Sequence, residues 1–223
     1  MKSIALLLAV FPLAAWAGGS NYGIAPGVRA ELVGKVTEWP VPTPKFARDP
    51  APAPDGSIFI SVMSGNKVAR FDPRTRTYRE WDMPAGHRPH GVLVDRQGIV
   101  WTTGNGNGTI GRLDPATGKV TEFRTPSGGG GPHTLVISED GGTIWFTMQS
   151  GDKVASLDTR TGAIKEYPIS GGPYGLARDR TRAEVAALPL RAGSQRSRPG
   201  SVAPGEFLRA RIEVVPHVVH RTV

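Results

Sequence analysis

The chain has 223 residues, enough for one large β domain or two small ones, and no cysteine, which excludes disulfides, thiol chemistry and cysteine-based metal sites. Its formal net charge is +8 at pH 7, but nine arginines against four acidic residues lie from residue 178 onward, whereas residues 18–177 are close to neutral. A nearly neutral body gives no electrostatic reason to expect nucleic acid or an anionic membrane as a partner.

The chain begins with the pattern of an export signal. Lys2 precedes an apolar run from Ile4 to Trp16, and Ala15 and Ala17 give the small-x-small shape of a cleavage site. We interpret residues 1–17 as a signal peptide and residues 18–35 as a lead-in, and we expect a periplasmic or secreted protein. The alternative is a membrane anchor, which the short length of the apolar run disfavours.

A repeat of about 42 residues runs from residue 36 to residue 177. Each unit ends in an acidic-aromatic strand, and the glutamates of these strands lie 42, 42 and 44 residues apart: Glu38, Glu80, Glu122 and Glu166. A turn that begins with aspartate precedes each later copy, at intervals of 42 and 44 residues: Asp72, Asp114 and Asp158. Two independent marks therefore give one period, which is typical of a repeat architecture.

Each unit contains four short strands and no amphipathic helix. The strands that open the units are predicted at 89–95, 132–137 and 173–177, the buried second strands at 57–61, 99–103 and 143–147, and the third strands at 67–72, 109–114 and 153–158. This pattern is typical of a β-propeller blade. We predict an all-β, partial β-propeller with blades at 41–84, 85–125 and 126–168, a leading strand at 36–40 and the start of a further blade at 169–177.

The repeat stops before residue 178. From Arg180 to Val223 the chain has no Trp, Tyr, Lys, Asn or Asp, while Arg, Ala, Pro and Gly are plentiful. We expect residues 178–223 to be a disordered or irregular non-repeat tail, the product of a frameshift or of a truncated gene fused to unrelated sequence. The alternative is a natural basic extension.

The blade motifs resemble those of the streptogramin lyase family, also called virginiamycin B lyases. They are Pro-His-Gly-Val at 89–92, Ile-Val-Trp-Thr-Thr at 99–103, Ile-Gly-Arg-Leu-Asp-Pro-Ala-Thr-Gly-Lys at 110–119 and Val-Thr-Glu-Phe at 120–123. The resemblance implies a seven-bladed propeller that confers antibiotic resistance by opening a macrocyclic streptogramin B lactone. It implies elimination assisted by Mg²⁺, and a cyclic depsipeptide or peptide as the ligand.

The resemblance also implies catalytic histidines at the starts of innermost strands. His90 and His133 occupy this position, 43 residues apart, and we expect both to point toward the central channel. A catalytic or metal-binding blade of the family would carry glutamate two residues before the histidine and just after the Trp strand. This chain departs there, with Arg88, Gly131, Gly104 and Met148. The metal ligands therefore remain unidentified, and the alternative is that both histidines only line the channel.

Three weaker motifs have simpler interpretations. His87-x-x-His90 and His217-x-x-His220 have metal-like spacing, but neither has a third ligand near it in the sequence. The glycine-rich segment 104–108 is more typical of a hairpin than of a phosphate cradle, because no helix follows it. The repeated glutamates are interpreted as solvated charges that protect the blade edges from pairing.

Three functional hypotheses follow. The first is a lyase-like propeller that lacks the lyase activity as it stands. The second is a non-catalytic periplasmic propeller that binds a peptide, glycan or protein. The third is that open propeller edges drive self-association or aggregation.

Overall fold

The computed structural model describes residues 37, 39–43, 45–169, 171–178 and 185–189. Apart from Thr37, these residues belong to one compact unit that begins at Trp39. The predicted signal peptide (1–17) and lead-in (18–35) lie outside the described residues. In the described part of the chain, no helix has the length and apolar character needed to cross a membrane.

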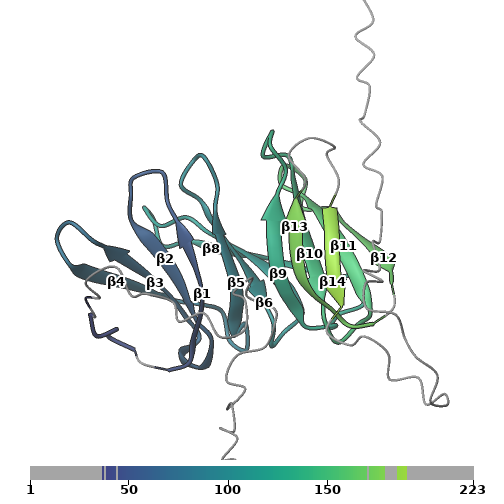
Figure 1. The fold of residues 1–223 in the computed structure, drawn as a ribbon, viewed down its shortest axis with the longest axis horizontal. Helices are drawn as coiled ribbons and strands as arrows, with labels where there is room; N and C mark the ends of the chain where they lie inside the picture. The colour runs from purple at the N-terminus through teal and green to yellow at the C-terminus, as the bar shows by residue number, and fades with distance from the viewer. Residues whose placement is uncertain (1–36, 38, 44, 170, 179–184, 190–223) are drawn as a thin grey trace, which may run out of the picture. The chain divides into compact units, whose positions relative to one another are not determined.

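Three four-stranded antiparallel sheets follow one another along the chain, each with its strands in sequential order (Figure 1). The first blade contains β1 (Ala47–Pro52), β2 (Ile58–Val62), the 3₁₀ turn η2 (Met63–Gly65), β3 (Lys67–Asp72) and β4 (Thr77–Asp82). The second contains β5 (Pro89–Val94), β6 (Val100–Gly104), β7 (Thr109–Leu113) and β8 (Val120–Arg124). The third contains β9 (Pro132–Ile137), β10 (Thr143–Met148), β11 (Lys153–Asp158) and β12 (Ile164–Pro168).

These sheets confirm the predicted all-β propeller blades. The sequence could predict them because local chemistry sets the turns between the strands. In the β5–β6 turn, for example, Asp95 Oδ1 accepts the backbone N–H of Gln97 at 3.0 Å, and Gly98 takes a left-handed φ of +81°. Glycine adopts this conformation without steric cost, so Asp95 and Gly98 together favour a chain reversal between β5 and β6.

Two regions differ from the prediction. Thr37, Trp39 and Pro40, in the predicted leading strand 36–40, are not in a strand. A strand requires a hydrogen-bonded partner, and no described strand pairs with this segment. Instead the Trp39 ring packs on Phe71 of β3, with ring centroids 5.3 Å apart.

The second difference lies in the predicted tail. Val185–Pro189 forms strand β14, which pairs antiparallel with β13 (Pro173–Arg178), so that Leu176 lies opposite Ala187. The prediction of a non-repeat tail rested on its composition, which lacks Trp and Tyr, but the backbone hydrogen bonds that join two strands do not depend on an aromatic side chain. The rest of the tail, at 179–184 and 190–223, lies outside the described residues.

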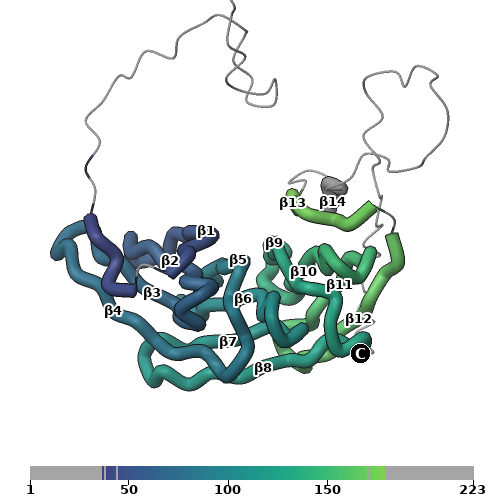
Figure 2. Tube along the Cα trace, turned by 90° about the horizontal axis from the view of Figure 1, so that it is seen from below, coloured from purple at the N-terminus to yellow at the C-terminus, as the bar shows by residue number. Residues whose placement is uncertain are grey.

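Neighbouring blades pack face to face and share their apolar cores. The core between the first and second blades joins Phe59 and Trp81 to Val100 and Leu113. A second core joins Trp101 of β6 to third-blade residues such as Phe146. The innermost strands β1, β5, β9 and β13 contact one another in series (Figure 2). Side chains at equivalent positions of these strands are therefore brought together.

Candidate functional site

The second residue of each innermost strand lies at an equivalent position. These residues are Arg48, His90, His133 and Tyr174, of strands β1, β5, β9 and β13. The pairing of each strand with its neighbour is irregular near this position, as between Pro89 and Val92 in the second blade. Such bulges redirect side chains and are frequent beside functional sites. We call these four residues the channel stack.

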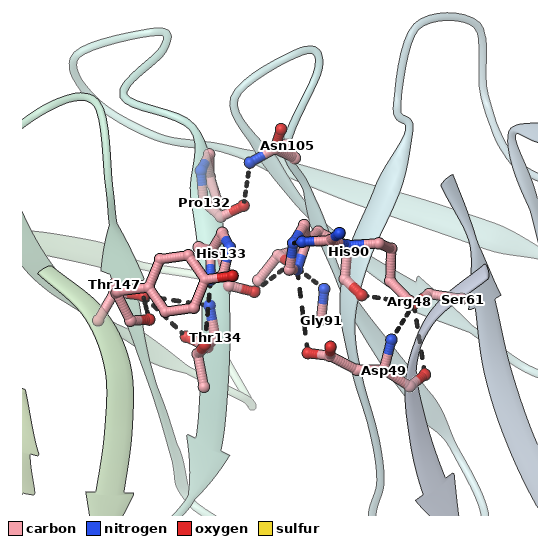
Figure 3. Close-up of polar contacts among 12 residues, drawn as sticks. Arg48, Asp49, Ser61, His90, Gly91, Asn105, Pro132, His133, Thr134 and Thr147 are labelled. Atoms are coloured by element: carbon pink, nitrogen blue, oxygen red, sulfur yellow. Dashed lines mark hydrogen bonds and ion pairs between the residues drawn. The ribbon is translucent and has the colours of Figure 1, made fainter. Parts of the chain in front are cut away.

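The members of the channel stack contact one another in chain order, and Figure 3 labels the first three, Arg48, His90 and His133. Arg48 Nε donates to His90 Nε2 at 2.9 Å. The His90 and His133 ring centroids are 3.6 Å apart, and those of His133 and Tyr174 are 4.0 Å apart. His90 and His133 are each only 3% exposed, whereas Tyr174 is 37% exposed. The stack therefore presents the tyrosine to solvent and covers both histidines.

In each blade, a side-chain hydroxyl on the second strand joins the innermost strand of that blade to the innermost strand of the next blade. Thr103 Oγ1 accepts the backbone N–H of Gly91 at 2.7 Å and donates to the carbonyl oxygen of His133 at 2.7 Å. Ser61 links Asp49 to His90 in the same way, and Thr147 links Thr134 to Tyr174. These three hydroxyls hold successive members of the channel stack against one another.

Close backbone approach explains the glycine that follows His90. A Cβ atom at Gly91 would lie 2.4 Å from the carbonyl oxygen of His133 and 2.6 Å from the Leu135 side chain. Since Cβ atoms do not tolerate such distances, a larger residue would push β5 away from β9. Glycine at this position therefore permits the histidine rings to stack.

The contact with Arg48 determines the tautomer of His90. A guanidinium only donates hydrogen bonds, so His90 Nε2 is the acceptor and the ring proton lies on Nδ1. Nδ1 is buried, has no hydrogen-bond partner among the described residues, and lies 3.9 Å from Asp49 Oδ2.

The surroundings of the stack keep both imidazoles neutral. Burial lowers the pKa of His90 to about 4, assisted by the proximity of His133 and Arg48. Burial and Arg48 also lower the pKa of His133 to about 4, against an opposing hydrogen bond with the Tyr174 backbone. Burial raises the pKa of Asp49, which favours its neutral form. Both imidazoles are therefore uncharged at neutral pH beside the Arg48 guanidinium.

The structure thus brings the two predicted catalytic candidates, His90 and His133, into direct contact. Sequence reasoning missed Arg48 and Tyr174, although the period carries the signal: they lie 42 residues before His90 and 41 residues after His133. The missed hydroxyls Ser61, Thr103 and Thr147 follow the same period. They went unnoticed because serine and threonine are common on strands and carry no charge.

His87 does not join His90 in a metal-like pair. It is fully buried between strands of its own blade, where Nδ1 lies 2.8 Å from Glu122 Oε1 and Nε2 lies 2.8 Å from Thr102 Oγ1. Burial lowers the pKa of His87, while Glu122 opposes the shift. His217 and His220 lie outside the described residues.

The interpretation of the repeated glutamates as solvated edge charges is wrong for the three that the structure describes. Each accepts hydrogen bonds from the segment that leads into its own blade, and these donors come from Thr43, His87 and Ser127. Each glutamate therefore ties the outermost strand of a blade to the connection before its innermost strand. The sequence could not show this, because 35 to 39 residues separate the partners.

The described residues do not fit a magnesium site. Among them, no three His, Asp or Glu side chains lie close enough together to hold a metal ion. Mg²⁺ prefers carboxylate oxygens, whereas the channel stack offers imidazoles, a guanidinium and a phenol. We derive no step through a metal ion in this part of the chain.

Comparison with known proteins agrees with the geometry of the blades. The sequence model of the Virginiamycin B lyase family matches residues 26–192. A virginiamycin B lyase from Nocardia farcinica is 34% identical over 91 residues, which cover 41% of this chain and 32% of that protein.

Solved structures show the same likeness. A streptogramin B lyase is 27% identical with a TM-score of 0.63, covering 69% of this chain and 52% of its own. A catalytically inactive His-to-Ala variant of virginiamycin B lyase from Staphylococcus aureus, solved with quinupristin, is 26% identical with a TM-score of 0.63, covering 69% of this chain and 53% of its own. The matched part of this chain spans about half the length of these solved relatives. Because the family model matches most of its residues, the chain belongs to the virginiamycin B lyase family.

Proposed function

We propose that this chain binds a macrocyclic peptide lactone of the streptogramin B type at the channel stack and does not open it. Membership of the family supports the ligand class, because one solved relative is a virginiamycin B lyase with quinupristin. The state of the two histidines supports the absence of turnover. This proposal combines the first two hypotheses drawn from the sequence.

Opening a lactone by elimination requires a base that removes a proton from carbon. Such a base needs a free lone pair that substrate can reach and a pKa near the operating pH. His90 lacks the first, because Arg48 occupies its Nε2 lone pair and Nδ1 carries the proton. Both histidines have a pKa of about 4 and are only 3% exposed, so they are weak and covered bases. The bond from Arg48 to His90 is the observation on which the proposal rests.

The same arrangement suits binding. The exposed Tyr174 ring offers an aromatic face on which a ring of the ligand stacks, backed by the imidazole of His133. The half-buried Arg48 carries guanidinium N–H groups at the other end of the stack, where they donate to ligand carbonyl oxygens.

The proposal is tested by incubating the purified chain with quinupristin and MgCl₂. We expect calorimetry to detect binding, and mass spectrometry to find the macrocycle intact. Tyr174→Ala should weaken binding about tenfold by removing the stacking face, whereas Tyr174→Phe should retain it. Tyr78→Ala, which removes an aromatic ring from an outermost strand, serves as the matched control and should bind like the original chain.

Two results would overturn the proposal. Ring-opened product that disappears in His90→Ala or His133→Ala would show that a covered histidine acts as the base. Absence of quinupristin binding by a folded chain, as judged by circular dichroism, would remove the channel stack as a ligand site.

We also propose that the chain acts after export, because its first 17 residues have the pattern of a signal peptide. Expression in a bacterial host followed by fractionation should find mature protein in the periplasm or medium, with an N-terminus at residue 18. Recovery of uncleaved protein in the cytoplasm would contradict this.

A further inference from the structure

A second concave site lies between the first and second blades. It is a cleft of about 380 Å³, lined by the β1–β2 turn and the outer strands of the first blade and by two turns of the second. β5 runs from His90, near its start, to the turn that contains Arg96. The cleft is therefore at the opposite end of the innermost strands from the channel stack.

Three arginines line this cleft, and two of them make an unfavourable pair. Arg70 of β3 lies directly opposite Arg79 of β4, and like charges at directly opposed positions destabilise a sheet. Arg96 adds a third guanidinium from the second blade. The repeat does not require this pair, since the equivalent partners are Arg112 with Thr121 and Ser156 with Lys165. Of the three four-stranded blades that the structure describes, only the first has arginine at both positions.

The charge of the cleft is only partly balanced. Asp55 Oδ2 accepts from Arg70 at 2.8 Å, and hydrogen bonds from Ser57 hold the pKa of Asp55 well below its usual range, so it stays ionised. Within the described ranges, neither Arg79 nor Arg96 forms an ion pair. Both are exposed. Two guanidinium groups thus remain available to an anion.

The wall beside these guanidinium groups is apolar and aromatic. Phe59 and Trp81 stack with centroids 5.9 Å apart, and the Arg79 guanidinium lies 4.7 Å from the Trp81 ring centroid. The Trp81 indole N–H is buried and has no hydrogen-bond partner among the described residues. Trp101 of the second blade, by contrast, donates its indole N–H to Asp95 at 2.9 Å. The cleft therefore combines two free cations, an unpaired donor on its lining and the edge of an aromatic core, where Phe59 is 2% and Trp81 7% exposed.

We propose that this cleft binds a small molecule that carries one oxyanion group, a carboxylate or a phosphate ester, on a flat apolar body. Arg79 and Arg96 bind the anion, and the apolar part lies against the edge of the core that Phe59 and Trp81 present to the cleft. Planar guanidinium groups match both anions through paired hydrogen bonds. This site is separate from the channel stack and does not depend on the proposed lactone binding.

Phenyl phosphate, benzoate and uncharged benzyl alcohol test the proposal when each is titrated into the ¹⁵N-labelled full chain. We expect the Trp81 indole resonance, assigned with Trp81→Phe, to shift with phenyl phosphate or benzoate and not with benzyl alcohol. The anion that binds more tightly identifies the ligand class. Because the experiment contains no lactone, its result is independent of the quinupristin assay.

Charge-removing variants test the assigned residues. Arg79→Gln and Arg96→Gln should each weaken anion binding about tenfold, because each removes a charge-assisted hydrogen bond. Arg112→Gln, the strand equivalent of Arg70 in the second blade, lies outside the cleft and should leave binding unchanged. Arg79→Lys should retain part of the affinity and shows whether charge or geometry matters. The proposal would be overturned if benzyl alcohol shifted the Trp81 indole resonance as much as the two anions do. It would also be overturned if Arg112→Gln and Arg96→Gln weakened anion binding equally.

Discussion

The lowered pKa values of His90 and His133 link the stability of the fold to pH. Unfolded imidazoles titrate near 6.5, whereas both folded histidines have a pKa of about 4. As pH falls from 7 toward 4, the unfolded chain takes up protons that the folded chain does not, so stability falls. We expect a loss on the order of 2 kcal/mol from each of the two histidines between pH 7 and pH 5.

Urea unfolding at pH 7, 6 and 5 measures this loss. This pH range lies above the one in which carboxylates with lowered pKa values, such as Asp55 and Asp114, take up protons. Buried His87, whose pKa is also lowered, contributes in the same direction. His133→Gln should therefore flatten the pH dependence without abolishing it. If the slope of the unfolding free energy against pH is unchanged in this variant, the channel stack is not the source of the pH dependence.

The buried contact between His87 and Glu122 is expected to stabilise the second blade. Glu122 Oε1 accepts hydrogen bonds from Asn107 and Thr109 and lies 2.8 Å from His87 Nδ1. Glu122→Leu leaves these partners unpaired and should cost about 2 kcal/mol in the free energy of unfolding. Glu139→Leu is the matched control, because the Glu139 side chain is 73% exposed and its ion pair with Arg178 spans 3.5 Å. Equal unfolding midpoints for the two variants would contradict the structural role assigned to Glu122.

Strand β6 is joined to two neighbours by one hydroxyl. Thr103→Val keeps the shape of the side chain but leaves the Gly91 N–H and the His133 carbonyl without their partner inside a buried contact. We expect a loss of about 1–3 kcal/mol in stability, together with changed chemical shifts of the His90 and His133 rings. Thr121→Val, on the half-buried outer strand β8, should change neither. Destabilisation without any change at the histidines would show that the hydroxyl supports the sheet but does not position the stack.

The stability lost when a buried tryptophan is removed should depend on the size of the core between blades to which it belongs. Trp101 is 2% exposed and packs with Leu135, Phe146 and other residues of the third blade, so Trp101→Ala should cost about 3–5 kcal/mol. Trp145 occupies the equivalent position one blade later, but its core has Val154 as its only other fully buried member among the described residues. Trp145→Ala should therefore cost less.

Amide hydrogen exchange measures how far the destabilisation caused by Trp101→Ala or Trp145→Ala spreads through the blades. Because the core around Trp101 belongs to two blades, Trp101→Ala should reduce amide protection in both β5–β8 and β9–β12. Loss confined to β5–β8 would mean that the second and third blades are independently stable, contrary to the shared core.

The strands and their grouping into blades could be predicted from the sequence, because the information is local. Alternating apolar residues, an aspartate turn and a glycine turn lie within a few residues of each other in every unit, and the period repeats them. This reasoning predicted a leading strand at 36–40, whose described residues are not in a strand, and it missed strand β14. Whether a segment forms a strand depends on a partner elsewhere in the chain, which periodicity does not supply.

The same period placed His90 and His133 at equivalent points and so predicted that both would line one channel. Only the folded chain shows that Arg48 donates to His90 Nε2, that Tyr174 covers His133 and that burial keeps both imidazoles neutral. These properties depend on distances between side chains that are about 40 residues apart in the sequence. Residue identity determined that an imidazole would be present, but packing against neighbouring blades decided its tautomer, its pKa and its access to a ligand.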